Sequence, residues 1–298
     1  MPNSTPREVE WPTLALLALC YLLWIAAAFW LADISAALAL VPMVLALVLH
    51  SSLQHEMLHG HPFRNPHLNE ALVFLPLGLV YPYRRFRDLH LAHHKDENLT
   101  DPYDDPESNY LDPAVWAGLP GWRRLVLRAN NSLLGRMTLG PAIGTVAFLR
   151  GELSLLRRGA PGVRRAWLLH AAGLAVVVAA VSASPMPGWL YALAAYLALS
   201  VLKIRTFLEH RAHQMPRGRT VIVEGQGLLS FLFLNNNLHV VHHARPRLAW
   251  YRLPAAFRES RSEWLRRNEG YIYSSYRDIF RRYFLRPKDP VPHPLFRR

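Results

Sequence analysis

Cysteine and acidic residues are both scarce in this sequence. The single cysteine, Cys20, lies inside an apolar run, so neither a disulfide framework nor a thiolate metal site is available. The 21 acidic residues are outnumbered by 34 Lys and Arg, which gives a net charge of +13. Nucleic-acid binding is one interpretation of a basic chain, but no recognition motif is evident and the basic residues flank apolar runs. The charge instead favours contact with anionic lipid headgroups.

Long apolar runs are abundant, and hydrophobic residues make up 51% of the chain. The run from Trp11 to Leu31 carries no charge and is long enough to cross a bilayer. The sequence therefore predicts an all-α membrane protein, with residues 1–298 forming a single integral-membrane domain. Four transmembrane helices are expected in two hairpins, at residues 11–31, 34–53, 166–184 and 189–208. A soluble helical bundle is the weaker alternative, because uncharged runs of about twenty residues are typical of membrane spans.

Basic residues are distributed unevenly around these runs. Of the 34, 13 lie within residues 84–165 and 17 within residues 211–298, whereas the short connections at 32–35 and 182–188 contain none. By the positive-inside rule, the loop 84–165, the tail 211–298 and both termini are predicted to lie in the cytoplasm. We expect a multi-pass protein of the cytoplasmic (inner) membrane. Three shorter apolar segments, 72–83, 140–149 and 228–234, are predicted to be interfacial or re-entrant.

Histidine forms the most informative pattern. Nine of the 15 histidines fall into three clusters and one single position, each at or near the end of an apolar segment. Imidazole is the commonest protein ligand for iron, copper and zinc, and spacings of three and four place such rings on one face of a helix. We therefore predict a cytoplasmic helical cap whose histidines bind metal: His55, His59, His90, His93, His94, His210, His239, His242 and His243.

Residues near the clusters are candidates to support these ligands. Four acidic residues could accept the distal N–H of a ligating imidazole, namely Asp88, Asp96, Glu97 and Asp101. Asn236 and Asn237 precede the third cluster and could orient a ligand, although an asparagine run is often just a turn. The other histidines, His61 and His213 among them, break the spacing and are not predicted to bind metal.

The number of imidazoles bears on the choice of metal. Eight or nine exceed the four ligands of tetrahedral zinc, so two metals are implied. The segment His55-Glu56-Met57-Leu58-His59 does match H-E-x-x-H, in which Glu is the general base of a zinc peptidase, but that alternative leaves the other clusters unexplained. A metal transporter is disfavoured, because transport needs polar ligands along a path through the spans. Iron with O₂ is favoured for oxidising an unactivated C–H bond.

From about Ile34 to Pro254, the chain resembles the membrane fatty acid desaturase superfamily. The resemblance rests on three histidine boxes, His55–His59, His90–His94 and His239–His243, together with His210. Two further segments, Asp101–Ser108 and Asn235–Pro254, are similar to a short bacterial branch of that superfamily. These boxes are specific for the superfamily and say little about the substrate.

The resemblance implies a centre of two iron ions that uses O₂ to desaturate or hydroxylate a C–H bond of a fatty acyl or other lipid-like substrate. The nine histidines would hold the irons, and no other side chain need act as acid or base. No cytochrome b5 or ferredoxin domain is evident, so electrons are expected from a separate donor, a ferredoxin or similar protein with its reductase. An oxidative demethylase or decarboxylase of a smaller molecule is the alternative within the superfamily.

Overall fold

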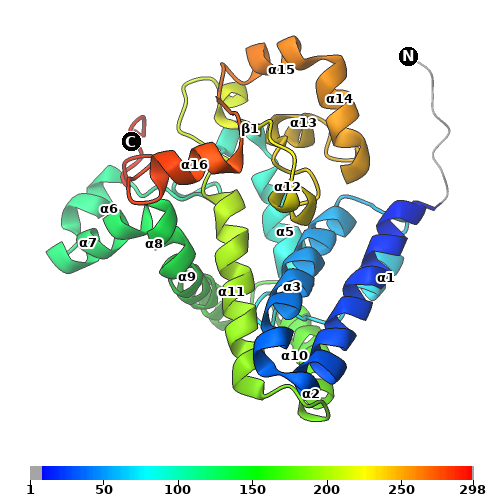
Figure 1. Ribbon diagram of the computed structural model, residues 1–298. Coiled ribbons are helices and arrows are strands. Elements are labelled where there is room, and N and C mark those ends of the chain that lie inside the picture. The colour runs from blue at the N-terminus through cyan, green and yellow to red at the C-terminus, as the bar shows by residue number, and fades with distance from the viewer. Residues whose placement is uncertain (1–8, 297–298) are drawn as a thin grey trace.

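The computed structural model describes residues 9–296, apart from the side chain of Asp96, and it is mostly helical. Four helices are long and apolar enough to cross a membrane: Trp11–Ile34, Ala36–Leu58, Val163–Ser182 and Gly188–Thr206. They agree in number and place with the four predicted spans, and the second helix continues past residue 53 to Leu58. In the labels of Figure 1, the first span comprises α1 (Trp11–Ile25), the π-helical turn η1 (Ala26–Leu31) and α2 (Ala32–Ile34). The others are α3 (Ala36–Leu58), α10 (Val163–Ser182) and α11 (Gly188–Thr206).

Local sequence explains where the spans begin. The Ser35 hydroxyl accepts a hydrogen bond from the backbone N–H of Ala37 at 3.2 Å, which caps the first turn of α3. Gly162 precedes α10 with a φ of 79°, a left-handed conformation that glycine adopts without steric cost. Pro187 precedes α11 with a φ of −62°, which suits the start of a helix.

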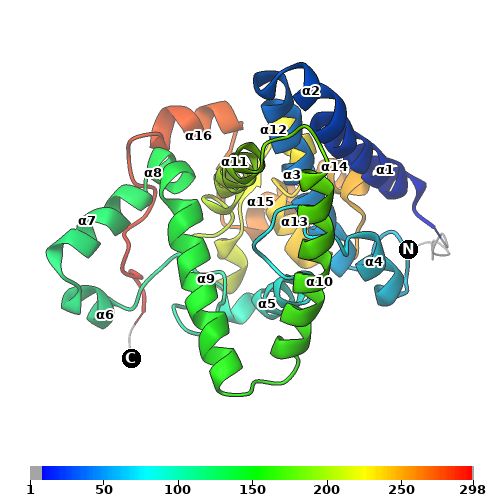
Figure 2. The same ribbon diagram turned by 90° about the horizontal axis from the view of Figure 1, so that it is seen from below.

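Helix α3 lies at the centre of the bundle, between α1 and α11 (Figure 1). Small buried residues such as Ala46 on α3 and Ala194 on α11 let these helices approach closely. Across the same core, the Trp24 indole donates to the Tyr191 hydroxyl at 3.0 Å, and Tyr191 in turn donates to the carbonyl of Leu77 at 2.8 Å. By contrast α10 packs mainly against α5 (Tyr83–His93) and α9 (Gly140–Arg157) (Figure 2). The pairing of the spans into hairpins and their orientation in the membrane stay predictions.

Short helices follow α3, and the three minor apolar segments differ in secondary structure. Segment 72–83 is largely irregular, whereas residues 140–149 form the first half of an eighteen-residue helix, α9. Residues 228–234 contain only the five-residue helix α12. The elements between the second and third spans are α4 (Pro66–Leu72), α5 (Tyr83–His93), η2 (Asp96–Asn98), α6 (Pro113–Gly118), α7 (Gly121–Asn130), α8 (Leu133–Thr138) and α9 (Gly140–Arg157).

Most of the region after α11 lies above the long helices in the view of Figure 1. Its elements are η3 (Pro216–Arg219), β1 (Ile222–Val223), α12 (Leu228–Leu232), α13 (His239–Ala244), η4 (Trp250–Arg252), α14 (Leu253–Glu259), α15 (Arg261–Arg267), β2 (Ile272–Tyr273) and α16 (Tyr276–Tyr283). Strands β1 and β2 pair in parallel, a small departure from the all-α prediction. The tail also reaches back to the end of the last span, where the Lys288 ammonium donates to the carbonyl of His210 at 3.0 Å.

Candidate metal centre

Four segments bring the nine predicted histidines to one place. His55 lies in the last turn of α3 and His59 ends that helix. Of the second cluster, His90 and His93 lie in the last turn of α5 and His94 directly follows that helix. The third cluster lies within α13, which begins at His239. His210 follows α11 and is held by a bridge to Thr220. The continuation of α3 beyond residue 53 is what carries its two histidines to the level of the others.

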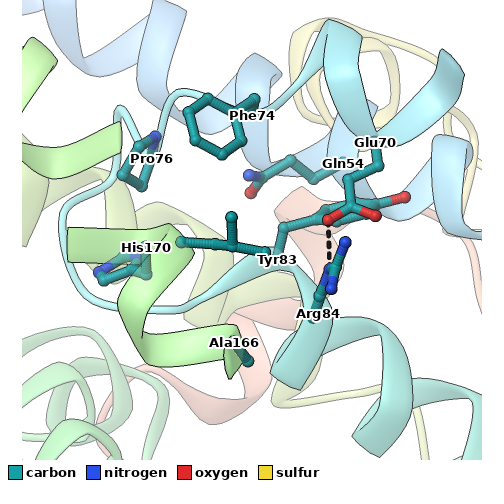
Figure 3. Close-up of a pocket in the computed structure, with 9 residues that line it drawn as sticks. Gln54, Glu70, Phe74, Pro76, Tyr83, Arg84, Ala166 and His170 are labelled. Carbon is teal, nitrogen blue, oxygen red and sulfur yellow. Dashed lines mark hydrogen bonds and ion pairs between the residues drawn. The ribbon is translucent and has the colours of Figure 1, made fainter. Parts of the chain in front are cut away.

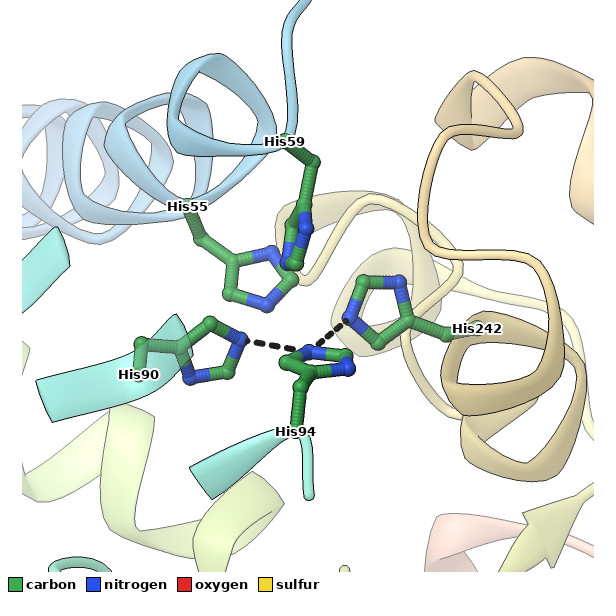
Figure 4. A group of neighbouring side chains, drawn as sticks. All are labelled: His55, His59, His90, His94 and His242. Atoms are coloured by element: carbon green, nitrogen blue, oxygen red, sulfur yellow. Dashed lines mark hydrogen bonds between the residues drawn. The ribbon is translucent and has the colours of Figure 1, made fainter. Parts of the chain in front are cut away.

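The nine rings form two separate groups, and within each group the possible ligand atoms lie within 4.8 Å of one another. The group of five, which Figure 4 shows, contains His55, His59, His90, His94 and His242. The group of four contains His93, His210, His239 and His243. We call them the five-histidine and the four-histidine group.

The division follows from helix geometry. His90 and His94 are four residues apart on α5 and share a face, so both join the five-histidine group. His93 lies about 100° around the helix from His94 and therefore faces the other group. On α13 the same rule pairs His239 with His243. The second and third clusters thus each contribute to both groups.

The Nε2 atoms point toward one another at distances that suit metal ligands. In the five-histidine group, Nε2 of His94 lies 2.9 Å from that of His90 and 3.1 Å from that of His242. In the four-histidine group, Nε2 of His210 lies 2.9 Å from that of His93 and 3.1 Å from that of His239. Two imidazole nitrogens bound at right angles to one metal, about 2.1 Å from each, would lie about 3 Å apart.

Three oxygen acceptors hold the opposite nitrogens of these rings. Nδ1 of His90 lies 2.8 Å from Glu107 Oε1, and Nδ1 of His93 lies 2.7 Å from Asp105 Oδ1. Nδ1 of His239 lies 2.9 Å from the side-chain oxygen of Asn236. A ring that donates from Nδ1 presents the lone pair of Nε2, which is the arrangement found around metal-bound histidines.

The acidic partners differ from those predicted. Asp88 pairs with Arg87 at 2.9 Å, and Asp101 accepts the backbone N–H groups of Tyr103 and Asp104. Glu97 is exposed, and the side chain of Asp96 lies outside the described part of the structure. The chain after α5 folds back, so the acids that reach the rings come from 12 and 17 residues further along. Proximity in sequence to the second cluster was the wrong signal.

The electrostatics leave most of these rings neutral. Burial lowers the pKa of His59, His94, His210, His239 and His242, and the neighbouring imidazoles lower each further. Neutral imidazole is the form that binds a metal. His93 is the exception, because Glu107 and Asp105 outweigh the effect of burial and raise its pKa to about 9. In return, His93 and His90 lower the pKa of Glu107 against the effect of its own burial.

Three other residues discussed in the sequence analysis lie outside the two histidine groups. Glu56 belongs to neither histidine group, because its carboxylate accepts the backbone N–H of Trp250 at 2.8 Å and lies near His61. The Asn237 side chain donates to the carbonyl of Val223 and so joins the chain before α13 to β1. His213 contacts the carbonyl of Met215 and belongs to neither group.

Two hollows lie beside the bundle. The first, between α3, α4, α5 and α10, is partly polar, and Arg84 pairs with Glu70 across it (Figure 3). The second is an apolar groove between α9 and α11, lined by residues such as Pro141, Val146 and Ala192. A groove of that chemistry beside a membrane span can accept an acyl chain.

Comparison with known proteins agrees with this geometry. The family model described as fatty acid desaturase matches residues 28–275, a segment that includes all nine histidines. No curated protein matches the chain.

Proposed function

The chain belongs to the fatty acid desaturase family, and we propose that it is an O₂-dependent di-iron enzyme that desaturates or hydroxylates a C–H bond of a fatty acyl or other lipid-like substrate. The observation that carries the proposal is the division of nine buried imidazoles into a group of five and a group of four. Two such groups suit two metal ions, and imidazole-rich sites suit iron.

In this proposal each group holds one iron through its Nε2 atoms. When bound, the irons supply the redox chemistry that activates O₂ for attack on an unactivated C–H bond. Asp105, Glu107 and Asn236 fix the ring orientations and tautomers of their histidine partners. Glu209, which pairs with Arg205 at 3.0 Å, adds a buried carboxylate near His239 and helps to balance the charge of the metals.

The setting of the site supports a membrane substrate. The two groups lie where the second and fourth spans end, and the apolar groove between α9 and α11 offers a place for an acyl chain. We place the site on the cytoplasmic side of the inner membrane, because the basic residues concentrate in the segments that carry it. A soluble electron donor, a ferredoxin or a similar protein with its reductase, would then have access to the irons.

The geometry gives less support to a zinc peptidase. In H-E-x-x-H enzymes the glutamate lies beside the metal and activates water. Here Glu56 is directed toward Trp250 and His61 and away from the rings of His55 and His59.

Metal analysis with a turnover assay tests the proposal. The purified protein should contain about two irons per chain, as its two ligand groups require. With a ferredoxin and its reductase, membranes containing it should consume O₂ and yield an unsaturated or hydroxylated lipid, detected by mass spectrometry of host lipids. One zinc without iron would refute the di-iron centre. Two irons with a product from a small polar molecule would support the demethylase or decarboxylase alternative.

A further inference from the structure

A third group of possible metal ligands lies outside the two histidine groups. It comprises Glu10, just before α1, Glu56 in the last turn of α3, and His61, just after α3. Their possible ligand atoms lie within 4.8 Å of one another. Glu56 and His61 are only 5% and 4% exposed. Neither carboxylate contributes to the proposed iron sites, so the H-E-x-x-H glutamate is left without a role there.

His61 has the same hydrogen-bond arrangement as two histidines of the iron groups. Its Nδ1 lies 2.9 Å from Glu10 Oε2, just as His90 and His93 bind carboxylates through Nδ1. Its Nε2 is buried and has no hydrogen-bond partner among the described residues. A ring held in this way directs the Nε2 lone pair into the space beside Glu56.

The space beside Nε2 has dimensions that suit a cation. Nε2 of His61 and Oε1 of Glu56 are 3.8 Å apart, too far for a hydrogen bond. A metal ion about 2.1 Å from each atom would bridge them with an angle of roughly 130°. The backbone N–H of Trp250 already binds the same Glu56 oxygen, which fixes the carboxylate in place.

We infer that Glu56 and His61, with Glu10 behind the imidazole or as a third ligand, bind a divalent transition-metal cation separate from the two irons. One imidazole nitrogen and carboxylate oxygens are a donor set that zinc and manganese accept. Two carboxylates would offset the positive charge of such an ion. Arg252 is a nearby positive charge, but its effect on His61 is smaller than that of Glu10 or Glu56. The ion would tie the segment before α1 to the end of α3, and through Trp250 to the loop after α13.

The inference is tested by counting both metals in one sample. Iron-loaded full-length protein in detergent is dialysed against Zn²⁺, and iron and zinc are then measured together. The wild type should bind about one zinc per chain, and Glu56→Gln and His61→Gln should each bind it at least about tenfold more weakly at unchanged iron content. Equal zinc binding by wild type and both variants would overturn the inference, as would no binding by the wild type.

Two controls keep the outcome interpretable. If a variant loses iron as well, Glu10→Gln decides, because Glu10 lies on a separate segment and contacts neither histidine group. His213→Gln, in a histidine outside all three groups, should bind zinc normally. X-ray absorption at the zinc edge should show one imidazole and oxygen ligands. A shell of several imidazoles would mean that zinc had entered an iron site, and would refute the third site.

Discussion

The Nε2 atoms of His93 and His210 lie 2.9 Å apart, although 117 residues separate the two histidines in the sequence. One comes from the end of α5 and the other from the chain that follows the last span. The four-histidine group therefore exists only when α5 and the chain after α11 are correctly assembled against each other.

Replacement of His210 should empty one metal site and spare the other. In His210→Ala, iron should fall from about two to about one per chain, because each histidine group holds its own ion. Lipid product should fall to background, because the chemistry needs both irons. Mass spectrometry measures the iron content per chain, and an assay of lipid product measures the activity. His213→Ala, three residues along the chain, is the matched control and should keep both.

Asp105 should set how tightly iron is held. Its carboxylate binds Nδ1 of His93 at 2.7 Å and accepts the backbone N–H of Thr100 at 2.8 Å. Loss of such a partner lowers metal affinity by about 10–100-fold, so Asp105→Ala should release iron to a chelator at correspondingly lower concentration. Asp105→Asn keeps a hydrogen-bond acceptor, so the chelator concentration that releases its iron should lie between those for wild type and Asp105→Ala. Asp104→Asn alters an exposed neighbour and should behave as wild type. Equal chelator resistance in all four proteins would contradict the role given to Asp105.

A buried ion pair should stabilise the helix that carries the second cluster. Arg85 on α5 binds both carboxylate oxygens of Glu152 on α9, at 2.8 and 2.9 Å, and Glu152 also accepts from the Trp167 indole. Arg85→Met leaves that carboxylate buried without its partner and should cost about 3–5 kcal/mol of unfolding free energy. Denaturant unfolding in detergent measures this.

The neighbouring pair provides the control for that measurement. Arg87 is half-buried and Asp88 is exposed, so the pair is well solvated and Arg87→Met should cost less than about 1 kcal/mol. Arg85→Met combined with Glu152→Met should recover much of the loss, because no charge then remains buried. If both single variants lost the same stability, the buried pair would have no special importance.

His293 should make stability depend on pH. Its Nδ1 accepts the backbone N–H of Leu295, and its Nε2 lies 3.1 Å from the Thr100 hydroxyl, so the folded protein holds the neutral ring. Burial and then Arg219 lower its pKa. The unfolded chain, with a histidine pKa of about 6.5, binds the proton more readily, so this contribution is present above about pH 6.5 and is lost as the pH falls below it.

The measurement compares melting temperatures at two pH values. Wild type should lose more thermal stability than His293→Gln when the pH is lowered from about 7.5 to about 5.5, a range that brackets the titration of the unfolded histidine. The difference between the two proteins isolates this residue from the other histidines. An equal fall in melting temperature for wild type and His293→Gln would show that His293 does not contribute to the pH dependence.

Local patterns in the sequence predicted the long apolar helices and the histidines that share a helix face. An apolar run identifies a span because the bilayer sets its length, and histidine spacing identifies one helix face. The four spans and the meeting of nine histidines followed from these signals. The same periodicity could also have divided the rings into five and four, since His93 and His94 cannot share a face.

Contacts between distant segments could not be predicted in this way. Asp105 and Glu107 reach the rings only because the chain after α5 turns back, which no local pattern shows. The partner of His61 is Glu10, 51 residues earlier in the chain. The spacing of His61 from the other histidines therefore did not indicate its surroundings. Glu56 matches a zinc-peptidase motif in the sequence, but its carboxylate accepts the backbone N–H of Trp250, 194 residues later, a contact that the motif does not show.

The bond from Lys288 to the carbonyl of His210 joins residues 78 positions apart and so has a meaning for biosynthesis. A ribosome adds about 5–20 residues each second, so roughly 4–16 s pass between the synthesis of the two partners. The first two histidine clusters are made earlier still, and neither group is complete before the third cluster emerges. For the di-iron centre proposed above, this order means that a complete site can receive iron only after the third cluster has been synthesised.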